Sequence, residues 1–198
     1  AQLYAQGARR HMELYGTTPR HFAEIAVTMR EHAILNGNVV MNKPLTVEDH
    51  HASRMISDPF RLFDCSLESD GGAAIVVSAA DRAKSLRKPL VTVMGVAEGH
   101  PESPASIAQR PDLLEFGLVK AAKRGYEMAG VGPKDMNLAE IYDCFTFTVI
   151  RQLEILGFCK TGEGGPFVMD GRIKLGGALP INTHGGLLSQ GHVVGLNH

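Results

Sequence analysis

The sequence has no tryptophan, only three cysteines and no long apolar run. Cys65, Cys144 and Cys159 cannot all pair and none lies in a CxxC motif, which argues against a disulfide scaffold and a structural zinc site. No apolar run approaches the roughly 18 residues of a membrane span, and no signal peptide is visible. We therefore expect a cytoplasmic protein with reduced thiols and no bound metal.

Neither sign of charge dominates, since the sequence has 20 Lys and Arg residues and 21 Asp and Glu residues. The lack of a basic excess argues against nucleic-acid binding. The hydrophobic fraction of 44% is ordinary for a globular protein. The chain begins inside a helical pattern at Ala1 and stops at His198 without a closing element, so we expect a fragment of something larger.

Helical patterns account for much of the chain. Thr18 followed by Pro19 is typical of a helix start, and Gly16 and Gly37 are typical of helix ends. From these signals and from apolar spacing we expect helices at residues 2–15, 19–36, from about 46, at 79–86, 111–129 and about 145–156.

Three segments have the composition of strands. GGAAIVV (71–77) and LVTVMGVA (90–97) are runs of small and β-branched residues that indicate buried strands, and LAEIYD (138–143) indicates a short third one. Strands that alternate with helices predict an α/β layered fold with a largely parallel or mixed sheet.

Cys144 lies where the third strand is expected to end and a helix to begin. Open α/β sheets bind ligands beyond the carboxyl ends of their strands, and a helix N-terminus lowers the pKa of a thiol. Cys144 is therefore a candidate reactive thiol, with a buried, inert cysteine as the alternative. We expect Cys65 and Cys159 to be structural.

A second candidate segment, residues 180–192, is rich in glycine and ends at a histidine. Paired glycines let a backbone come close to a ligand. Asn182 and the backbone N–H groups of such a loop can stabilise an oxyanion, and His192 can serve as acid, base or hydrogen-bond donor near neutral pH. A tight turn that carries an incidental histidine is the alternative.

The other histidines show no metal-ligand spacing. His50 and His51 are adjacent and cannot share a helix face, so we expect both at the surface. His11, His21 and His32 lie in helical segments and are expected to be solvated or partly buried.

Several segments resemble sterol-carrier-protein-type thiolases, a branch of the thiolase superfamily. AEIYDCF (139–145) resembles their HDCF-type motif, and NTHGGLLSQGHVVG (182–195) resembles their NPSGGLISKGHPLG-type stretch. RHMELYGTTPRHFAEIAV (10–27) and PFRLFDCSLESDGGAAIVV (59–77) are similar to the loop region and last strand of the thiolase N-terminal half. The resemblance extends through nearly the whole chain.

The resemblance implies a thiolase-like layered fold (αβαβα) that is incomplete in this chain. Residues 1–85 would be the end of the N-terminal half with its loop region, and residues 86–198 a truncated C-terminal half. None of the three cysteines matches the family's nucleophile, which belongs to an earlier part of the N-terminal half.

The resemblance also implies roles for individual residues. Cys144 matches the cysteine that exchanges a proton with the substrate α-carbon, and His192 matches the histidine that assists the nucleophile and binds the thioester oxygen. Tyr142 is the third catalytic candidate and stands where thiolases have a histidine or asparagine that helps build an oxyanion hole. The residues expected to support that oxyanion hole and the glycine-rich loop are Asp143, Asn182, Gly185, Gly186 and Gly191.

The activity that the resemblance implies is the making or cleaving of a carbon–carbon bond in a 3-oxoacyl-CoA by a thiolase-like acyltransferase. Coenzyme A would be a substrate, with no covalently bound cofactor. The tyrosine at position 142 also fits a second activity, a retro-aldolase acting on a β-hydroxyacyl-CoA such as a steroid side chain. Such aldolases resemble a pattern with tyrosine in place of the loop histidine, whereas this chain retains that histidine as His192. A non-catalytic protein that binds lipid or acyl-CoA is a third possibility. A homodimer and an OB-fold, zinc-ribbon partner subunit are expected from the family.

Overall fold

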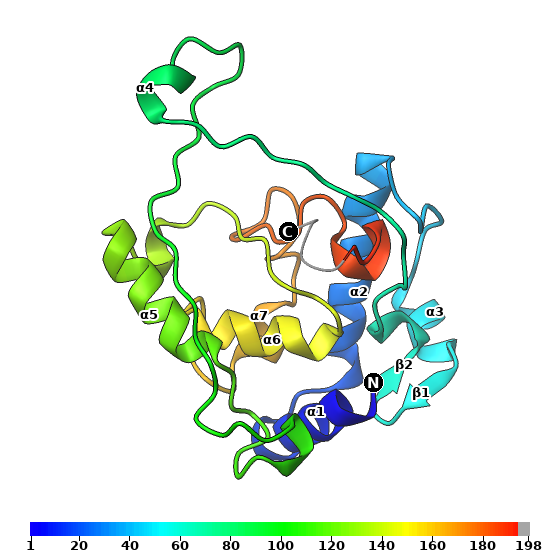
Figure 1. Ribbon diagram of the computed structural model, residues 1–198. Coiled ribbons are helices and arrows are strands. Elements are labelled where there is room, and N and C mark those ends of the chain that lie inside the picture. The colour runs from blue at the N-terminus through cyan, green and yellow to red at the C-terminus, as the bar shows by residue number, and fades with distance from the viewer. Residues whose placement is uncertain (194–198) are drawn as a thin grey trace.

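A computed structural model describes residues 1–193 and consists mainly of helices joined by long connections (Figure 1). Two short strands, β1 (Met55–Ser57) and β2 (Phe60–Arg61), form an antiparallel hairpin. The helices are α1 (Gln2–Tyr15), α2 (Pro19–Asn36), α3 (Val47–Ala52), α4 (Ala80–Ala83), α5 (Leu118–Ala129), α6 (Thr146–Ile155) and α7 (Gly164–Phe167). Shorter helical turns are η1 (Leu62–Asp64), η2 (Ile107–Gln109), η3 (Pro133–Asp135) and the π-type turn η4 (Gly186–Gln190).

Helix α2 is the central element of the body. It begins after the extended residue Thr18, with Pro19 in the first turn, and ends at Gly37 in the left-handed region (φ 79°), as the sequence predicts. Apolar side chains cover most of its circumference, so it is buried between α3, α6, α7 and η4.

The core joins α2 to α6 and to the segment before η4. Its largest fully buried side chains include Phe22 and Met29 of α2, Phe147 and Leu153 of α6, and Ile181. Burial of each such side chain stabilises the fold by about 1.5–3 kcal/mol relative to exposure. This packing holds the start of α6 and the segment that carries Ile181 in fixed positions.

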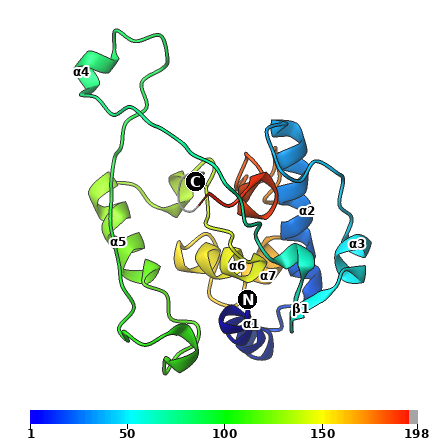
Figure 2. The ribbon, with the colours of Figure 1, turned by 45° about the vertical axis from the view of Figure 1, so that its right-hand side comes forward.

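The strands expected at 71–77 and 90–97 do not form among the described residues, and this part of the prediction is wrong for them. Both segments are extended but exposed, with Val76 95% and Val91 90% accessible. They lead to and from α4, which stands away from the rest of the chain in two views (Figures 1 and 2). A strand needs a neighbour for its N–H and C=O groups, and among residues 1–193 no strand pairs with these segments.

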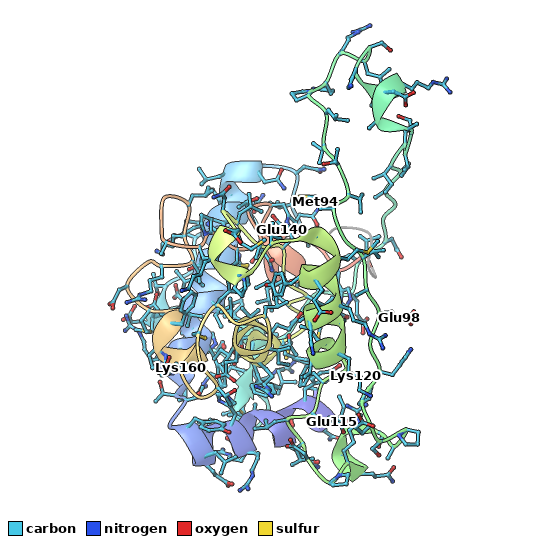
Figure 3. The ribbon with its side chains drawn as sticks, turned by 90° about the vertical axis from the view of Figure 1, so that its left-hand side faces the viewer. Met94, Glu98, Glu115, Lys120, Glu140 and Lys160 are labelled. Atoms are coloured by element: carbon cyan, nitrogen blue, oxygen red, sulfur yellow. The ribbon has the colours of Figure 1, made fainter. Side chains whose placement is uncertain are left out.

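The segment that returns from α4 runs along helix α5. This helix is shorter than the helix expected at 111–129. Figure 3 shows Met94 and Glu98 on the extended chain beside this helix, which carries Lys120. A Cβ at Gly99 would overlap the backbone of Gly117, so small residues permit this close approach.

The third expected strand, 138–143, is reduced to a single parallel bridge between Ala139 and Ile181. A second, antiparallel bridge joins Cys65 to Phe145. Next to it, Ser66 N–H donates to the Cys144 carbonyl at 3.0 Å. These two bridges bring residues 139–145 between two segments that are distant in sequence.

Three histidines are more buried than the sequence suggests. His50, expected at the surface, is 1% exposed, with its Nε2 2.8 Å from the Asp64 carboxylate. His11 lies against the buried Glu154, and His32 accepts a hydrogen bond from Leu175 N–H. Each histidine is buried because a partner satisfies its ring nitrogens. Among residues 1–193, no helix is long and apolar enough to cross a membrane.

Candidate active site

Three segments meet where Cys144 and His192 lie: residues 64–69, residues 139–145 and the glycine-rich residues 180–192. Backbone hydrogen bonds tie them together, from Ser66 N–H to Cys144 and from Asn182 N–H to Ala139. All three residues expected to be catalytic, Cys144, Tyr142 and His192, are brought into this one region.

Asn182 holds the segment that precedes the candidate thiol. It has φ 45°, a left-handed conformation that asparagine tolerates better than most residues. Its buried side chain accepts from Ile141 N–H at 2.6 Å and donates to the Ile141 carbonyl at 2.7 Å. Both ends of the amide are thus engaged by the backbone of Ile141.

Asp143 connects the thiol segment to the glycine-rich loop. Its fully buried carboxylate accepts from Leu187 N–H at 2.7 Å and from Leu188 N–H at 3.3 Å, at the start of η4. A Cβ at Gly186 would overlap this carboxylate, so only glycine allows the approach. Gly185, at φ 111°, likewise lies against Ala33 of α2.

Two serines orient His192. Its backbone N–H donates to Ser69 Oγ at 3.1 Å, and its Nδ1 lies 3.0 Å from Ser66 Oγ. Gly191, at φ 152°, turns the chain just before the histidine. When Nδ1 donates to Ser66, Nε2 is the acceptor nitrogen of the ring.

Tyr142 lies between the histidine and the thiol. Its hydroxyl is 3.3 Å from His192 Nε2, with the ring centroids 5.9 Å apart and the rings edge to face, and it lies close enough to Cys144 to lower the pKa of that thiol. Its carbonyl accepts from the Gln152 amide and the Thr148 hydroxyl, which fixes its backbone to α6. Burial, and then the negative charge of a Cys144 thiolate, raise the pKa of Tyr142 to about 12.

Cys144 precedes the first turn of α6 but is not an activated thiol. It is only 6% exposed, and burial raises its pKa to about 11 despite hydrogen bonds from Thr148 and Tyr142. This corrects the expectation that the helix N-terminus lowers the pKa, because desolvation outweighs the helix dipole here. The thiol is therefore protonated near neutral pH and suited to donate a proton.

The other two cysteines are also protonated near neutral pH. Burial raises the pKa of Cys65 to about 11 and that of Cys159 to about 12. Both pack against the core, as expected for structural cysteines. Within residues 1–193, no three His, Cys, Asp or Glu side chains converge as metal ligands.

No sequence pattern points to Ser66 or Ser69, nor to Tyr4, whose ring packs on Phe145 beside Cys144 with centroids 5.0 Å apart. These residues reach the site from other elements through tertiary packing. A cavity of about 420 Å³ opens beside Ser69 and Gly191, so the histidine end of the site borders open space.

A family model described as "Thiolase C-terminal domain-like" matches residues 99–197. The chain is 43% identical, over 96% of its length, to half of the "17-hydroxy-3-oxo-4-pregnene-20-carboxyl-CoA lyase" of Mycobacterium tuberculosis. It is 38% identical, over 98% of its length, to half of an acetyl-CoA acetyltransferase of Methanothermobacter thermautotrophicus. The chain spans about half the length of the curated relatives it matches.

A solved structure described as the "Ltp2-ChsH2(DUF35) aldolase" superimposes with a TM-score of 0.93 at 39% identity, covering 98% of this chain and 52% of that one. The expected thiolase-like fold, present only in part, is thereby confirmed. The expected membership of the thiolase superfamily is confirmed as well. The chain belongs to the thiolase superfamily, in the branch that includes sterol-carrier-protein thiolases.

Proposed function

We propose that the protein containing this chain cleaves a carbon–carbon bond in a β-hydroxyacyl-CoA by a retro-aldol reaction. The observation that carries the proposal is the position of the Tyr142 hydroxyl, which lies 3.3 Å from His192 Nε2 and close enough to the Cys144 thiol to lower its pKa. Such a reaction needs one group that removes a proton from the substrate hydroxyl and one that protonates the carbon left behind.

The first proton leaves through Tyr142. As the phenol oxygen takes the proton of the substrate hydroxyl, its own proton passes to His192 Nε2, 3.3 Å away. A free phenolate is not formed, which matters because the pKa of Tyr142 is raised to about 12. The bond between the α- and β-carbons then breaks, leaving a ketone or aldehyde and the enolate of a shorter acyl-CoA.

The second proton comes from Cys144. Since burial raises its pKa to about 11, the thiol is protonated when the enolate forms and can give its proton to the α-carbon. The resulting thiolate regains a proton from His192 through Tyr142, which lies close to both groups. The cycle consumes no further reactant.

The relatives support this assignment. Two of them, 41% and 43% identical, are described as a steroid side-chain-cleaving aldolase and as a pregnene-carboxyl-CoA lyase. We infer a CoA thioester substrate with a bulky β-hydroxylated acyl chain, of which a steroid side chain is one example.

Thiolytic cleavage of a 3-oxoacyl-CoA is the second candidate, favoured by the presence of Cys144 and His192 together and by the acetyltransferase relative. It would require a nucleophilic thiol, which in the family belongs to an earlier part of the N-terminal half; within this chain, burial raises the pKa values of Cys65 and Cys159, so neither is suited to that task. A protein that binds acyl-CoA without turnover is the third candidate.

Product analysis of the full-length protein separates these reactions. With a β-hydroxyacyl-CoA substrate and no free CoA, we expect equal amounts of a ketone or aldehyde and a shorter acyl-CoA. Turnover that requires free CoA and a 3-oxoacyl-CoA would replace the proposal with thiolysis. Binding without turnover of either substrate would favour the non-catalytic candidate.

We further propose that the protein works with a partner subunit, because the similar structure is described with a DUF35 component. A homodimer and a zinc-ribbon, OB-fold architecture for the partner remain expectations from the family. Light scattering of the co-expressed pair tests this assembly, and a monomer that turns over substrate alone would contradict it.

A further inference from the structure

The short segment 66–69 holds His192 at two points. The Ser69 hydroxyl accepts the backbone N–H of the histidine at 3.1 Å, and the Ser66 hydroxyl lies 3.0 Å from its ring nitrogen Nδ1. The first contact fixes the backbone of the histidine, and the second restricts rotation of its ring. The Tyr142 hydroxyl lies 3.3 Å from the other ring nitrogen, Nε2, so each nitrogen has a hydroxyl partner.

Ser66 is itself fixed by the two segments that form the rest of the site. Its backbone N–H donates to the Cys144 carbonyl at 3.0 Å. The N–H of the next residue, Leu67, donates to the Leu187 carbonyl of η4 at 3.4 Å. The serine hydroxyl therefore has a defined position relative to both the candidate thiol and the glycine-rich loop.

The chemistry of the two hydroxyls sets the direction of the hydrogen bonds. A neutral imidazole has one N–H donor and one acceptor nitrogen, so the two hydroxyls cannot both donate to it. The phenol of Tyr142 is the more acidic hydroxyl and hence the better donor. Donation from Tyr142 to Nε2, and from Nδ1–H to the Ser66 oxygen, satisfies both ring nitrogens of His192.

We propose that Ser66 is a positioning residue that selects the tautomer of His192 with its proton on Nδ1, and thereby directs the acceptor nitrogen Nε2 at Tyr142. When Nε2 takes the Tyr142 proton, the ring becomes positively charged, and the Ser66 oxygen stabilises that charge by accepting Nδ1–H. Ser66 itself neither gains nor loses a proton. The tautomer stands on the hydrogen-bond geometry, and its use in carbon–carbon cleavage rests on the proposed function.

The test compares Ser66→Ala, which removes the hydroxyl, with Ser66→Thr, which keeps it, in the full-length protein. The tautomer is measured by ¹⁵N NMR of histidine-labelled protein at pH 8, where imidazole side chains are ordinarily neutral. His192→Gln assigns the signals. In the wild type and in Ser66→Thr we expect a protonated Nδ1 and an unprotonated Nε2. In Ser66→Ala the two nitrogen shifts should move toward each other, because both tautomers are then populated.

Ser53→Ala is the matched control, because the Ser53 hydroxyl donates to the His50 carbonyl at 2.7 Å in another part of the chain. Its His192 signals should equal those of the wild type. A proton on Nε2 in the wild-type protein would overturn the proposal, and so would wild-type shifts in Ser66→Ala. A threonine variant that behaves like the alanine variant would overturn it too, because the serine would then act through its size rather than its hydroxyl.

Steady-state kinetics with a β-hydroxyacyl-CoA separates this proposal from the function on which it rests. We expect kcat of Ser66→Ala to fall about three- to tenfold, as for loss of one hydrogen bond. KM should stay unchanged, because the hydrogen bond strengthens only when the ring becomes charged. If nothing is cleaved yet the tautomer changes in Ser66→Ala, the proposed function fails and the tautomer assignment stands. If Ser66→Ala cleaves at the wild-type kcat, the function stands and the role of Ser66 is rejected.

Discussion

At the scale of single residues, the site is defined by a buried thiol and a partly exposed phenol that both hold their protons, rather than by an activated nucleophile. Cys144 and Tyr142 both keep their protons near neutral pH because burial raises their pKa values to about 11 and about 12. The two motifs predicted Cys144, Tyr142 and His192 as candidate site residues, and the structure places them in one region. Ser66 and Tyr4 could not be predicted, because only the folded chain brings Ser66 to His192 and a residue of α1 to the ring of Phe145.

Removing the Tyr142 hydroxyl should interrupt the route between substrate and His192. We expect Tyr142→Phe to lower kcat by about 10² to 10⁴, the usual contribution of a positioned acid or base, with little change in KM. Steady-state kinetics checks this. Tyr126→Phe is the control, because its hydroxyl donates to the Leu156 carbonyl on another part of the chain. Equal losses in both variants would contradict a specific role for Tyr142.

At the scale of elements, helices were predictable and strands were not. Helices α1 and α2 carry their own start and stop signals, so their bounds follow from Thr18, Pro19, Gly16 and Gly37. The composition of 71–77 and 90–97 fits strands, but pairing depends on residues elsewhere, which no local pattern specifies. The glycine-rich loop takes its shape from Asp143, again a contact between distant segments.

Asp143→Asn should loosen η4 while preserving the size of the side chain. A hydrogen bond to a charged group contributes about 1.5–3 kcal/mol. In Asp143→Asn, the neutral amide oxygen would accept more weakly than the carboxylate, and an amide NH₂ that faced the N–H group of Leu187 or Leu188 could not accept from it at all. We expect the free energy of unfolding to fall by about 2 kcal/mol and activity to fall with it. Urea unfolding measures the first effect, and unchanged stability together with full activity would refute the assigned link.

Glu154 gives α6 a pH-dependent contribution to stability. Burial alone would raise its pKa, but hydrogen bonds from His11, Gly164 N–H and Arg151 outweigh burial and lower it. A carboxyl whose pKa is lowered in the folded state stabilises the fold above its unfolded pKa, and that contribution is lost as pH falls through the folded pKa. Glu154→Gln should therefore destabilise the protein at pH 7 by about 2 kcal/mol and progressively less below about pH 4.

Unfolding of Glu154→Gln across pH 3 to 7 checks this sign. Glu13→Gln is the control, because Glu13 forms only an exposed ion pair with Arg10 at 3.8 Å and should leave stability unchanged. A loss in Glu154→Gln that is constant across this pH range would show that packing, not charge, explains the effect.

At the scale of the whole molecule, the candidate site lies beside exposed segments that form no strand pairs among residues 1–193. The matched relatives are about twice as long, and the similar structure superimposes on only 52% of its own chain. The thiolase-like architecture was predictable from two motifs in a fixed order. The pairing of its strands was not, since pairing depends on residues that no local pattern specifies.

We expect the segments 71–77 and 90–97 to be paired strands in the full-length protein. Their amide protons should exchange slowly there and rapidly in the 198-residue chain alone. Hydrogen exchange by mass spectrometry compares the two forms, with the amides of α2 as a reference that is protected in both. Rapid exchange of both segments in the full-length protein would exclude this arrangement.

The most direct test of the central claim is α-proton exchange in D₂O, measured on the saturated acyl-CoA product with wild-type protein, Cys144→Ala and Tyr142→Phe. If Cys144 delivers the proton to the α-carbon, the wild type incorporates deuterium and Cys144→Ala does not. Tyr142→Phe loses cleavage but keeps exchange, although at a reduced rate. Exchange in Cys144→Ala at the wild-type rate would contradict the account, because another group would then be protonating the α-carbon.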